Sequence, residues 1–309
     1  MNPAVRDRLL RRLPCPARAA ERLAPHTSFR IGGPAEVFAQ PRTAAELSEA
    51  LRIARAEQVP VFYLGLGSNI LVSDEGFDGM VIHAQEDLCR MRMQGSIVCS
   101  GPGARLLDLT VFVAVWGLSG MEPLSGIPGS VGGGLYMNAG AYGAEISDTF
   151  VEADVLLEDG SVQKLRRGDI RFGYRRAPEL ANVIILESRY NLKPADRQNI
   201  YGEMRRVWKL RRTKQPLDFP SAGSIFKRPP GDYAGRLIEA VGGKGARVGG
   251  AMVSPKHAGI FVNAGGATAS DVAALVRDIR RRVYDEFHVL LEPEVKPVGF
   301  KEDPFAIES

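Results

Sequence analysis

Between Thr43 and Ala54 the apolar residues stand three or four positions apart, which predicts a helix with one buried face. Thr43 and Glu46 have the spacing of a capping box, so the helix should begin at this threonine. Short apolar runs at 36–40 and 59–64 predict one strand before the helix and one after it. The order strand, helix, strand predicts a small α/β unit in this part of the chain.

Further along, short apolar runs predict five strands, at 80–84, 96–100, 149–157, 161–165 and 182–192. Asp159 and Gly160 lie between the third and the fourth run and predict a hairpin turn, because glycine adopts a positive φ at little cost. The apolar spacing over 104–116 predicts a helix, and Gly117 is placed to end it.

The last third of the chain again mixes helices with strands. The helical spacing of the apolar residues over 196–214 predicts a basic helix with one apolar face, and Pro216 should end it. A second amphipathic helix should begin at Ser270 as its cap. Strands are expected at 225–227, 260–263 and 290–298. The segment 212–221 is the best candidate for a domain boundary.

Composition narrows the class of protein. The chain has 309 residues, 45% of them hydrophobic and 25% charged, which excludes a mainly disordered chain and fits about two globular domains. The 40 basic residues outnumber the 36 acidic ones, a mild excess that allows an anionic small molecule as ligand without requiring nucleic acid. No apolar run approaches the ~18 residues that cross a bilayer, so we expect no membrane association.

The 3 cysteines and 4 histidines show no spacing typical of a metal site, so we expect none. The small, odd number of cysteines favours a reducing compartment, and we expect a cytoplasmic protein. Residues 1–23 are rich in arginine and predict a surface helix in an N-terminal extension, with a transit peptide as the alternative.

The segment Gly65–Leu71 follows a predicted strand and reads Gly-Leu-Gly-Ser-Asn-Ile-Leu. Its glycines let backbone N–H groups approach an anion, and Ser68 and Asn69 add side-chain donors. It lacks the Lys-Ser/Thr pair of a nucleoside triphosphate loop and the glycine spacing of a Rossmann loop. A phosphate-binding loop and a plain tight turn both remain open.

Glycine is concentrated between Gly117 and Gly143, where the sequence has nine glycines in 27 residues. Each glycine in a helix costs roughly 1 kcal/mol, so such density is expected mainly where backbone touches a ligand. No lysine or arginine occurs from Leu106 to Glu152, so anion binding here would depend on backbone amides. A flexible linker fits poorly, because apolar residues are interleaved throughout.

Three shorter motifs carry candidate polar chemistry. Phe172–Arg176 places arginines beside aromatic residues, which suits a carboxylate, although a plain surface arginine is the simpler interpretation. Ser221–Lys227 places Ser224 between a glycine and a predicted strand; a hydrolase nucleophile is a poor interpretation, since no suitably placed His-Asp pair is evident. In Leu291–Val295 a carboxylate could be a salt-bridge partner or a catalytic group.

These five motifs, in this order, resemble those of the bacterial UDP-N-acetylenolpyruvoylglucosamine reductase family, also called UDP-N-acetylmuramate dehydrogenases. Thr27–Ala35 and Lys256–Asn263 are similar to further motifs of that family. The likeness extends over residues 24–299, and the compact chain looks like the shorter form of the family. Arg228 stands where longer-form members more typically carry asparagine, a departure that bears on the diphosphate contacts.

The resemblance implies an α+β fold, with a two-subdomain FAD-binding module of the vanillyl-alcohol-oxidase/PCMH-like type and a C-terminal α+β substrate-binding domain. The FAD module is expected at residues 24–211, with subdomains at about 24–88 and 89–211. The substrate domain is expected at residues 212–290. Residues 291–309 are expected to form a strand that returns to the FAD module, followed by a tail. We expect a monomer.

The resemblance also implies the reaction. NADPH would reduce non-covalently bound FAD and leave; the enolpyruvyl ether of UDP-N-acetylglucosamine would then receive a hydride from the flavin at its vinyl terminus, giving UDP-N-acetylmuramate for peptidoglycan precursor synthesis. The residues implied to bind FAD belong to the first two motifs: Gly65, Gly67, Ser68, Asn69, Ile70, Ser125, Gly126, Gly129, Ser130, Gly132 and Gly133. Those implied to bind the substrate are Tyr174, Lys214 and Lys227.

Three further residues are implied to act in catalysis. Ser224 would donate the proton that completes the reduction; a hydroxyl is a weak acid in water, but its target becomes strongly basic. Arg175 would hold the substrate carboxylate, and because hydride addition places more charge there, it would stabilise the transition state more than the ground state. Glu294 would help to polarise that carboxylate and would have to be protonated or bridged to a cation.

Two other classes of function stand beside this one. A flavin oxidase of the same fold, acting on a sugar or an alcohol, often tethers its flavin through His or Cys, and neither residue type occurs between Cys99 and His257. A nucleotide-binding or nucleic-acid-binding module would use the basic helix at 205–214, where Trp208 is the only aromatic residue.

Overall fold

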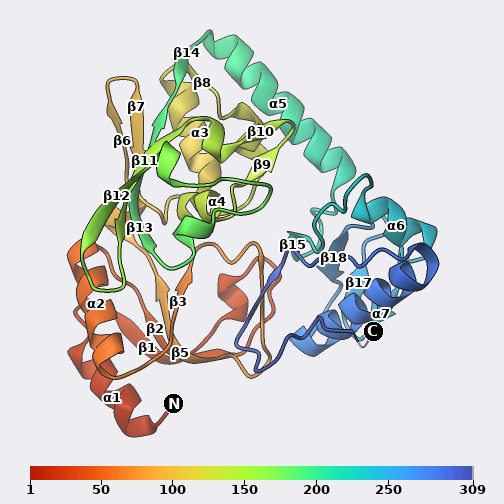
Figure 1. Ribbon diagram of the computed structural model, residues 1–309, viewed down its shortest axis with the longest axis horizontal. Helices are drawn as coiled ribbons and strands as arrows, with labels where there is room; N and C mark the ends of the chain where they lie inside the picture. Colours follow the sequence, from red (N-terminus) through yellow and green to blue (C-terminus); the bar gives the residue numbers. More distant parts are fainter. Residues whose placement is uncertain (308–309) are drawn as a thin grey trace. The chain divides into compact units, whose positions relative to one another are not determined.

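The computed structural model describes residues 1–307, which form two compact units (Figure 1). Unit 1 comprises residues 1–19, 37–66 and 79–211, and unit 2 comprises residues 20–36, 67–78 and those from 212 onward. The boundary falls inside three strands, β1 (Ala17–Arg22), β2 (Pro34–Ala39) and β5 (Phe77–His83), so the chain passes between the units repeatedly.

A four-stranded sheet has the order β1-β2-β5-β3, in which β3 (Val61–Leu64) runs parallel to β5. Helix α2 (Ala44–Ala56) connects β2 to β3, and α1 (Pro3–Arg12) packs against α2. Leu9 of α1 and Met80 of β5 belong to one buried apolar cluster. The predicted strand–helix–strand unit and the predicted N-terminal helix are confirmed.

Thr43 caps α2 as predicted, because its Oγ1 accepts the backbone N–H of Glu46 at 3.1 Å. The main contacts of the Glu46 carboxylate are with Arg42: it accepts the Arg42 backbone N–H at 2.7 Å and pairs with the Arg42 guanidinium at 3.1 Å. Its interaction with the Thr43 backbone N–H, the other half of the predicted capping box, is smaller. These contacts, the backbone one first, hold the pKa of Glu46 below its ordinary value.

The larger sheet of unit 1 is antiparallel and has the order β12-β11-β13-β7-β6. Its strands are β12 (Val162–Arg166), β11 (Phe150–Leu156), β13 (Ile184–Asn191), β7 (Ile97–Ser100) and β6 (Met91–Gln94). The predicted turn at Asp159 and Gly160 joins β11 to β12, and Gly160 has a φ of +87°.

One apolar core attaches this sheet to α3 (Leu106–Val115), η3 (Glu122–Gly126) and α4 (Val131–Tyr136). The predicted helix at 104–116 is thus confirmed as α3, and Gly117 ends it with a φ of +68°. The other short elements of unit 1 are η2 (Glu86–Cys89), β8 (Leu118–Ser119), β9 (Gly140–Ala141), β10 (Ala144–Glu145), η4 (Ile146–Asp148), η5 (Arg167–Asp169), η6 (Pro178–Leu180) and β14 (Lys193–Pro194).

Helix α5 (Arg197–Lys214) is a long helix that follows β14 (Figure 1). The prediction differs by one residue, since Asp196 lies just before the helix and its carboxylate accepts the backbone N–H of Gln198 at 2.8 Å. The buried side chains of α5 are those of Ile200, Met204 and Val207.

The sheet of unit 2 is antiparallel in the order β15-β18-β17-β16. Its strands are β15 (Ser221–Ser224), β16 (Arg247–Val248), β17 (Ala251–Val253) and β18 (Ile260–Asn263). Helix α7 (Ala269–Phe287) packs on β16, β17 and α6 (Ala234–Ala240). Elsewhere in unit 2, η1 (Ala24–His26) follows β1, and β4 (Ile70–Val72) pairs in parallel with β19 (Lys296–Val298).

Three predicted boundaries in unit 2 are wrong. Thr268, not Ser270, caps α7; the Ser270 hydroxyl instead donates to the Asp74 carboxylate at 2.9 Å. The strand expected at 225–227 ends at Ser224. The strand expected at 290–298 is reduced to its last three residues in β19.

Within residues 1–307, no helix is long and apolar enough to cross a membrane. The same residues contain no group of three or more His, Cys, Asp or Glu side chains placed to hold a metal ion. The cysteines Cys15, Cys89 and Cys99 form no disulfide.

Candidate active site

The first two glycine motifs meet inside unit 1. Gly65 directly follows β3, and a Cβ built on it would stand 2.3 Å from the Ser130 Oγ. Real Cβ atoms do not approach that closely, so a side chain at this position would force Ser130 to move. The Ser130 Oγ in turn accepts the backbone N–H of Gly133 at 3.2 Å and begins α4. Gly65, Ser130 and Gly133, all predicted to bind cofactor, are therefore brought together.

The second motif is also attached to the loop before α3. The backbone N–H of Val131 donates to the Ala104 carbonyl at 2.8 Å, and that of Gly132 donates to the Pro102 carbonyl at 2.9 Å. With Gly133 bonded to Ser130, three successive amides already have partners within the protein. The amides of Gly132 and Gly133, two residues predicted to bind cofactor, are thus bonded within the protein.

Ser125, in η3, has a hydroxyl that the protein leaves without a hydrogen bond. Its Oγ is buried, and no partner for it occurs among residues 1–307. A buried hydroxyl without a partner costs about 1–3 kcal/mol. Such an atom marks a place where a ligand can supply the missing partner.

A cation from α5 reaches this motif, and the sequence analysis missed it. The Arg211 Cδ lies 3.4 Å from the point at which a Cβ on Gly126 would stand. Burial lowers the pKa of Arg211, and no carboxylate in residues 1–307 pairs with it. The signal was present: Arg211 follows the buried Val207 by four residues, so it lies on the same face of the helix.

The third motif adjoins the end of the second. Arg175 has a φ of +55°, in the left-handed region that is costly for a residue with a side chain. Its Nη2 donates to the Gly140 carbonyl at 3.0 Å, and its guanidinium carbon lies 5.0 Å from the centre of the Tyr174 ring. Asn138 donates from Nδ2 to the Gly173 carbonyl at 3.1 Å. Arg175 and Tyr174 are thus held beside the second motif.

In unit 2 the rest of the first motif contacts the Thr-Ser-Phe-Arg segment. A Cβ on Gly67, which has a φ of +59°, would stand 2.4 Å from the His26 carbonyl oxygen. Ser28 donates its backbone N–H to the Gly67 carbonyl at 3.0 Å and its hydroxyl to the Ser221 carbonyl at 2.7 Å. The segment therefore links this motif to β15, the strand that ends in Ser224.

Ser224 and Glu294 are connected through the backbone of Ile225. Ile225 follows Ser224 directly, and its carbonyl accepts the backbone N–H of Glu294 at 2.7 Å. Asn69 donates from Nδ2 to the Glu294 carbonyl at 3.2 Å, while Ile70 lies in β4. Ser224 is exposed and Glu294 is partly buried. Unit 2 thus brings two of the three predicted catalytic residues together, and the third, Arg175, lies in unit 1.

The two lysines predicted to bind substrate have different surroundings. Lys227 forms an ion pair with Glu292, and its backbone N–H donates to the Glu292 carbonyl at 2.9 Å. Lys214 is exposed at the last residue of α5. Lys256 donates from Nζ to the Arg212 carbonyl at 2.7 Å and so fixes this end of the helix.

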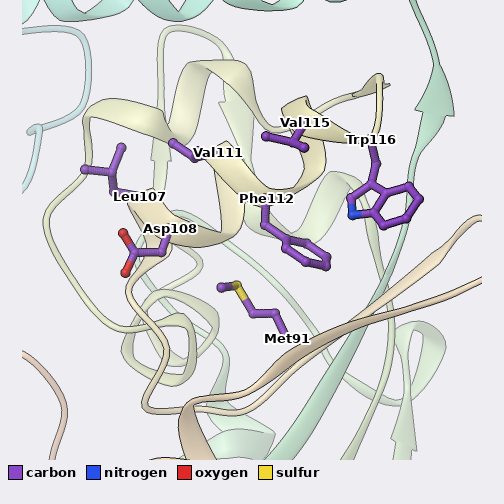
Figure 2. A pocket seen from close by; sticks show the side chains of 7 residues that line it. All are labelled: Met91, Leu107, Asp108, Val111, Phe112, Val115 and Trp116. Carbon is purple, nitrogen blue, oxygen red and sulfur yellow. The ribbon is translucent and has the colours of Figure 1, made fainter.

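An open groove on the outer face of α3 has a different character. It encloses about 520 Å³ and is lined by Met91 and by six residues of α3 and its end, among which Asp108 alone is charged (Figure 2). The opposite face of α3 packs on η3 and α4. The groove brings no set of converging polar groups together, so it does not resemble a catalytic site.

Two family models match this chain, one in its N-terminal part and one in its C-terminal part. Residues 35–166 match the model of an FAD binding domain. Residues 215–298 match the model of the C-terminal domain of UDP-N-acetylenolpyruvoylglucosamine reductase. The predicted fold, an FAD-binding module followed by a C-terminal domain of this reductase, is confirmed.

Two relatives and one solved structure are similar over nearly the whole chain. UDP-N-acetylenolpyruvoylglucosamine reductase 2 of Symbiobacterium thermophilum is 47% identical over 301 residues, 97% of this chain and 98% of the relative. The reductase of Streptococcus thermophilus is 43% identical over 282 residues, 91% of this chain and 92% of the relative. The crystal structure of the Thermus caldophilus reductase has a TM-score of 0.78 and 36% identity, over 92% of this chain and 98% of that one. The chain therefore belongs to the UDP-N-acetylenolpyruvoylglucosamine reductase family.

Proposed function

We propose that this protein uses NADPH and bound FAD to reduce the enolpyruvyl ether of UDP-N-acetylglucosamine to UDP-N-acetylmuramate. The proposal is supported by family membership together with the glycine site of unit 1. In that site the buried Ser125 hydroxyl has no hydrogen-bond partner, and Arg211, whose pKa burial lowers, has no carboxylate partner among residues 1–307. We also propose that the FAD module extends over residues 24–211 and the substrate domain over residues 212–290.

FAD fits the residues of this site. The contact between Gly65 and Ser130 brings the first and the second glycine motif together, so both can contribute to one cofactor site. Ser125 offers a hydroxyl without a partner, and Arg211 offers a positive charge beside Gly126. When bound, FAD supplies the redox chemistry by taking two electrons from NADPH and passing them to the substrate.

Arg175 is proposed to hold the carboxylate of the enol ether. Reduction adds negative charge to this carboxylate in the transition state, and a fixed guanidinium stabilises that charge most. The Gly140 carbonyl and the Tyr174 ring orient the Arg175 guanidinium, which limits the reorganisation needed when the charge develops. The strained backbone at Arg175 supports the same interpretation, since such strain is concentrated at functional sites.

Ser224 is proposed to donate the proton. As the vinyl terminus is reduced, the carbon between the ether oxygen and the carboxylate becomes basic and takes the proton from the hydroxyl. Solvent can return a proton to the serine, because Ser224 is exposed. Glu294, which lies in unit 2 with Ser224 and is bonded to Ile225 through its backbone N–H, is proposed to polarise the substrate carboxylate.

Lys214 and Lys227 are proposed to bind the diphosphate of the sugar nucleotide. The ion pair between Lys227 and Glu292 means that the diphosphate has to displace a carboxylate from this lysine. Lys214 stands at the fixed end of α5 and faces no such competition among the described residues.

The proposed setting is the cytoplasm, with the protein acting as a monomer. The support for the cytoplasm is that Cys15, Cys89 and Cys99 are free thiols, as is usual in a reducing compartment. Gel filtration at micromolar concentration tests the monomer directly.

Anaerobic spectroscopy tests the function. The purified protein should carry the visible absorption bands of oxidised flavin, and NADPH should bleach them in the absence of oxygen. Addition of the enolpyruvyl ether should restore the colour, whereas UDP-N-acetylglucosamine, which lacks the vinyl group, should not. A colourless protein that cannot be loaded with FAD contradicts the proposal, as does bleaching by a sugar or an alcohol without NADPH.

A further inference from the structure

His257 lies in the turn before β18 and has a defined hydrogen-bonding role. The backbone N–H of Gly259 donates to the His257 Nδ1 at 3.2 Å. Burial, followed by the charge of Lys244, lowers the pKa of His257, which keeps the ring neutral. A neutral ring that accepts at Nδ1 carries its proton on Nε2.

The imidazole is packed closely in place. A Cβ on Gly259 would stand 3.1 Å from the His257 Cε1, so the ring lies directly on the Gly259 backbone. Gly235 of α6 approaches the same ring atom, with its own Cβ position 3.9 Å away. The His257 carbonyl accepts the backbone N–H of Ile260 at 3.0 Å, and the Ser254 Oγ accepts the backbone N–H of His257 at 3.3 Å. The ring therefore has a fixed position relative to Gly259.

Gly259 passes this constraint to the strand that ends in Ser224. Gly259 is buried, so its N–H needs a partner, and the imidazole supplies it. The Gly259 carbonyl accepts the backbone N–H of Ile225 at 3.0 Å. The Ile225 carbonyl accepts the backbone N–H of Glu294 at 2.7 Å. One side chain thus begins a series of hydrogen bonds that runs through Ile225 to Glu294.

Ser224 is held mainly through its backbone, because it pairs with Ile260 of β18 and the next residue, Ile225, is bonded to Gly259. It is exposed, so it has little packing of its own, and it follows Gly223, which has a φ of +73° and no side chain. The N–H that Ile225 donates to the Gly259 carbonyl belongs to the peptide group between Ser224 and Ile225. Movement of the Gly259 peptide would turn the Ser224–Ile225 peptide and the hydroxyl with it.

We propose that His257 is a positioning residue for Ser224: by accepting the Gly259 N–H, it fixes the peptide that orients the Ser224 hydroxyl. The inference rests on the proposed function of Ser224 as proton donor. The hydrogen bonds of His257, to Ser254, Gly259 and Ile260, all lie within unit 2, so we expect the reduction of flavin by NADPH not to depend on it.

Three substitutions at His257 separate the acceptor atom from the bulk of the ring. His257→Leu removes the acceptor and keeps volume, His257→Asn keeps an acceptor at the place of Nδ1, and His257→Gln places one farther out. In stopped-flow experiments on the FAD-loaded protein, His257→Leu should slow reoxidation by the enol ether about 10- to 100-fold, since misplacing a reacting group by about 1 Å costs on that order. Reduction by NADPH should not change. His257→Asn should recover most of the rate and His257→Gln should not; equal rates in the Asn and Gln variants overturn the proposal.

A double-mutant cycle distinguishes this inference from the proposed function. If His257 acts through Ser224, adding His257→Leu to Ser224→Ala should slow reoxidation no further. Multiplying effects overturn the positioning role. If Ser224→Ala slows reoxidation and His257→Leu does not, this inference alone fails; if Ser224→Ala has no effect, the proton-donor proposal fails and the inference with it.

Hydrogen exchange gives a readout that does not depend on turnover. The amides of Gly259 and Ile225 should exchange faster in His257→Leu than in the unmodified protein, and His257→Asn should restore their protection. His288→Asn is the matched control, since His288 is exposed and has a φ of +55°, which asparagine tolerates. Unchanged protection at both amides in His257→Leu contradicts the proposed series of bonds.

Discussion

The side chain of Arg211 lies against Gly126, with its Cδ 3.4 Å from the point at which a Cβ would stand. The arginine comes from α5 and the glycine from η3, so the fold brings a cation to a glycine motif that has none of its own. No carboxylate in residues 1–307 pairs with Arg211, and burial lowers its pKa. A desolvated, unpaired cation destabilises the unliganded protein and is ready for an anionic or strongly polar ligand.

Replacement of this cation by a neutral side chain should have opposite effects on folding and on cofactor binding. Arg211→Met keeps an apolar stem, so the stability of the FAD-free protein should be unchanged or slightly higher. FAD binding should weaken by about 1.5–3 kcal/mol, the range for a lost hydrogen bond to a charged group. Thermal unfolding and fluorescence titration with FAD measure the two effects. Arg205→Met, at an exposed position of the same helix, is the control, and equal FAD affinity in both variants would rule the contact out.

A methyl group at the first glycine should disrupt the meeting of the two glycine motifs. In Gly65→Ala the new Cβ would collide with the Ser130 Oγ at 2.3 Å, so we expect a loss of about 1–3 kcal/mol in stability and weaker FAD binding. Adding Ser130→Gly should restore most of the loss, because glycine at a helix N-cap costs only a few tenths of a kcal/mol. Gly168→Ala is the control, since nothing lies within 4 Å of its Cβ position. Failure of the second substitution to rescue would contradict the collision.

The local elements of the fold could be predicted from residues that are close in the sequence. Thr43 before an apolar helical pattern identifies the start of α2, and Gly160 identifies the hairpin, because caps and turns depend on residues a few positions apart. Arg211 could have been found in the same way, since it stands one helical turn after the buried Val207.

What failed depends on contacts between distant residues. Thr268 and Ser270 are both good caps for α7, and Asp74, nearly 200 positions earlier in the chain, engages Ser270 and leaves Thr268 as the cap. The apolar run at 290–298 forms only a short strand, because its partner β4 is 3 residues long. Neither partner can be identified from spacing alone.

Loss of the proposed proton donor should affect one half of the reaction. Ser224→Ala should leave reduction of the flavin by NADPH intact and slow its reoxidation by the enol ether about 100-fold or more, the scale of general acid catalysis. Stopped-flow absorbance under nitrogen measures each half separately. Ser221→Ala, at the start of the same strand, is the control, since Ser221 is bonded to Ser28 through its backbone carbonyl. Equal loss of both half-reactions would contradict the role of Ser224.

Charge alone should not replace the guanidinium of Arg175. Arg175→Lys keeps the positive charge but loses the planar fork that can bind a carboxylate with two hydrogen bonds. We expect kcat for the enol ether to fall by about 10-fold or more, with reduction by NADPH unchanged, because a charged hydrogen bond contributes about 1.5–3 kcal/mol. Arg176→Lys, at the exposed neighbouring position, should behave as the unmodified protein. Normal kinetics in Arg175→Lys would exclude a role for the fork.

The lowered pKa of His257 predicts how stability changes with pH. The ordinary histidine pKa is 6.5, and burial lowers it in the folded protein. Below about pH 6.5 the unfolded chain therefore binds a proton at this residue that the folded chain does not, so stability should fall as the pH falls from 6.5 toward the folded value. Above pH 6.5 this contribution to stability is fully present.

Replacement of the titrating ring isolates this effect. His257→Asn keeps an acceptor for the Gly259 N–H but cannot take up a proton, so its urea midpoint should fall less between pH 7 and pH 5 than that of the unmodified protein. His288→Asn, at an exposed histidine, is the matched control for the replacement of a histidine by asparagine. The same loss of stability in His257→Asn and in the unmodified protein would show that the acid sensitivity comes from other groups.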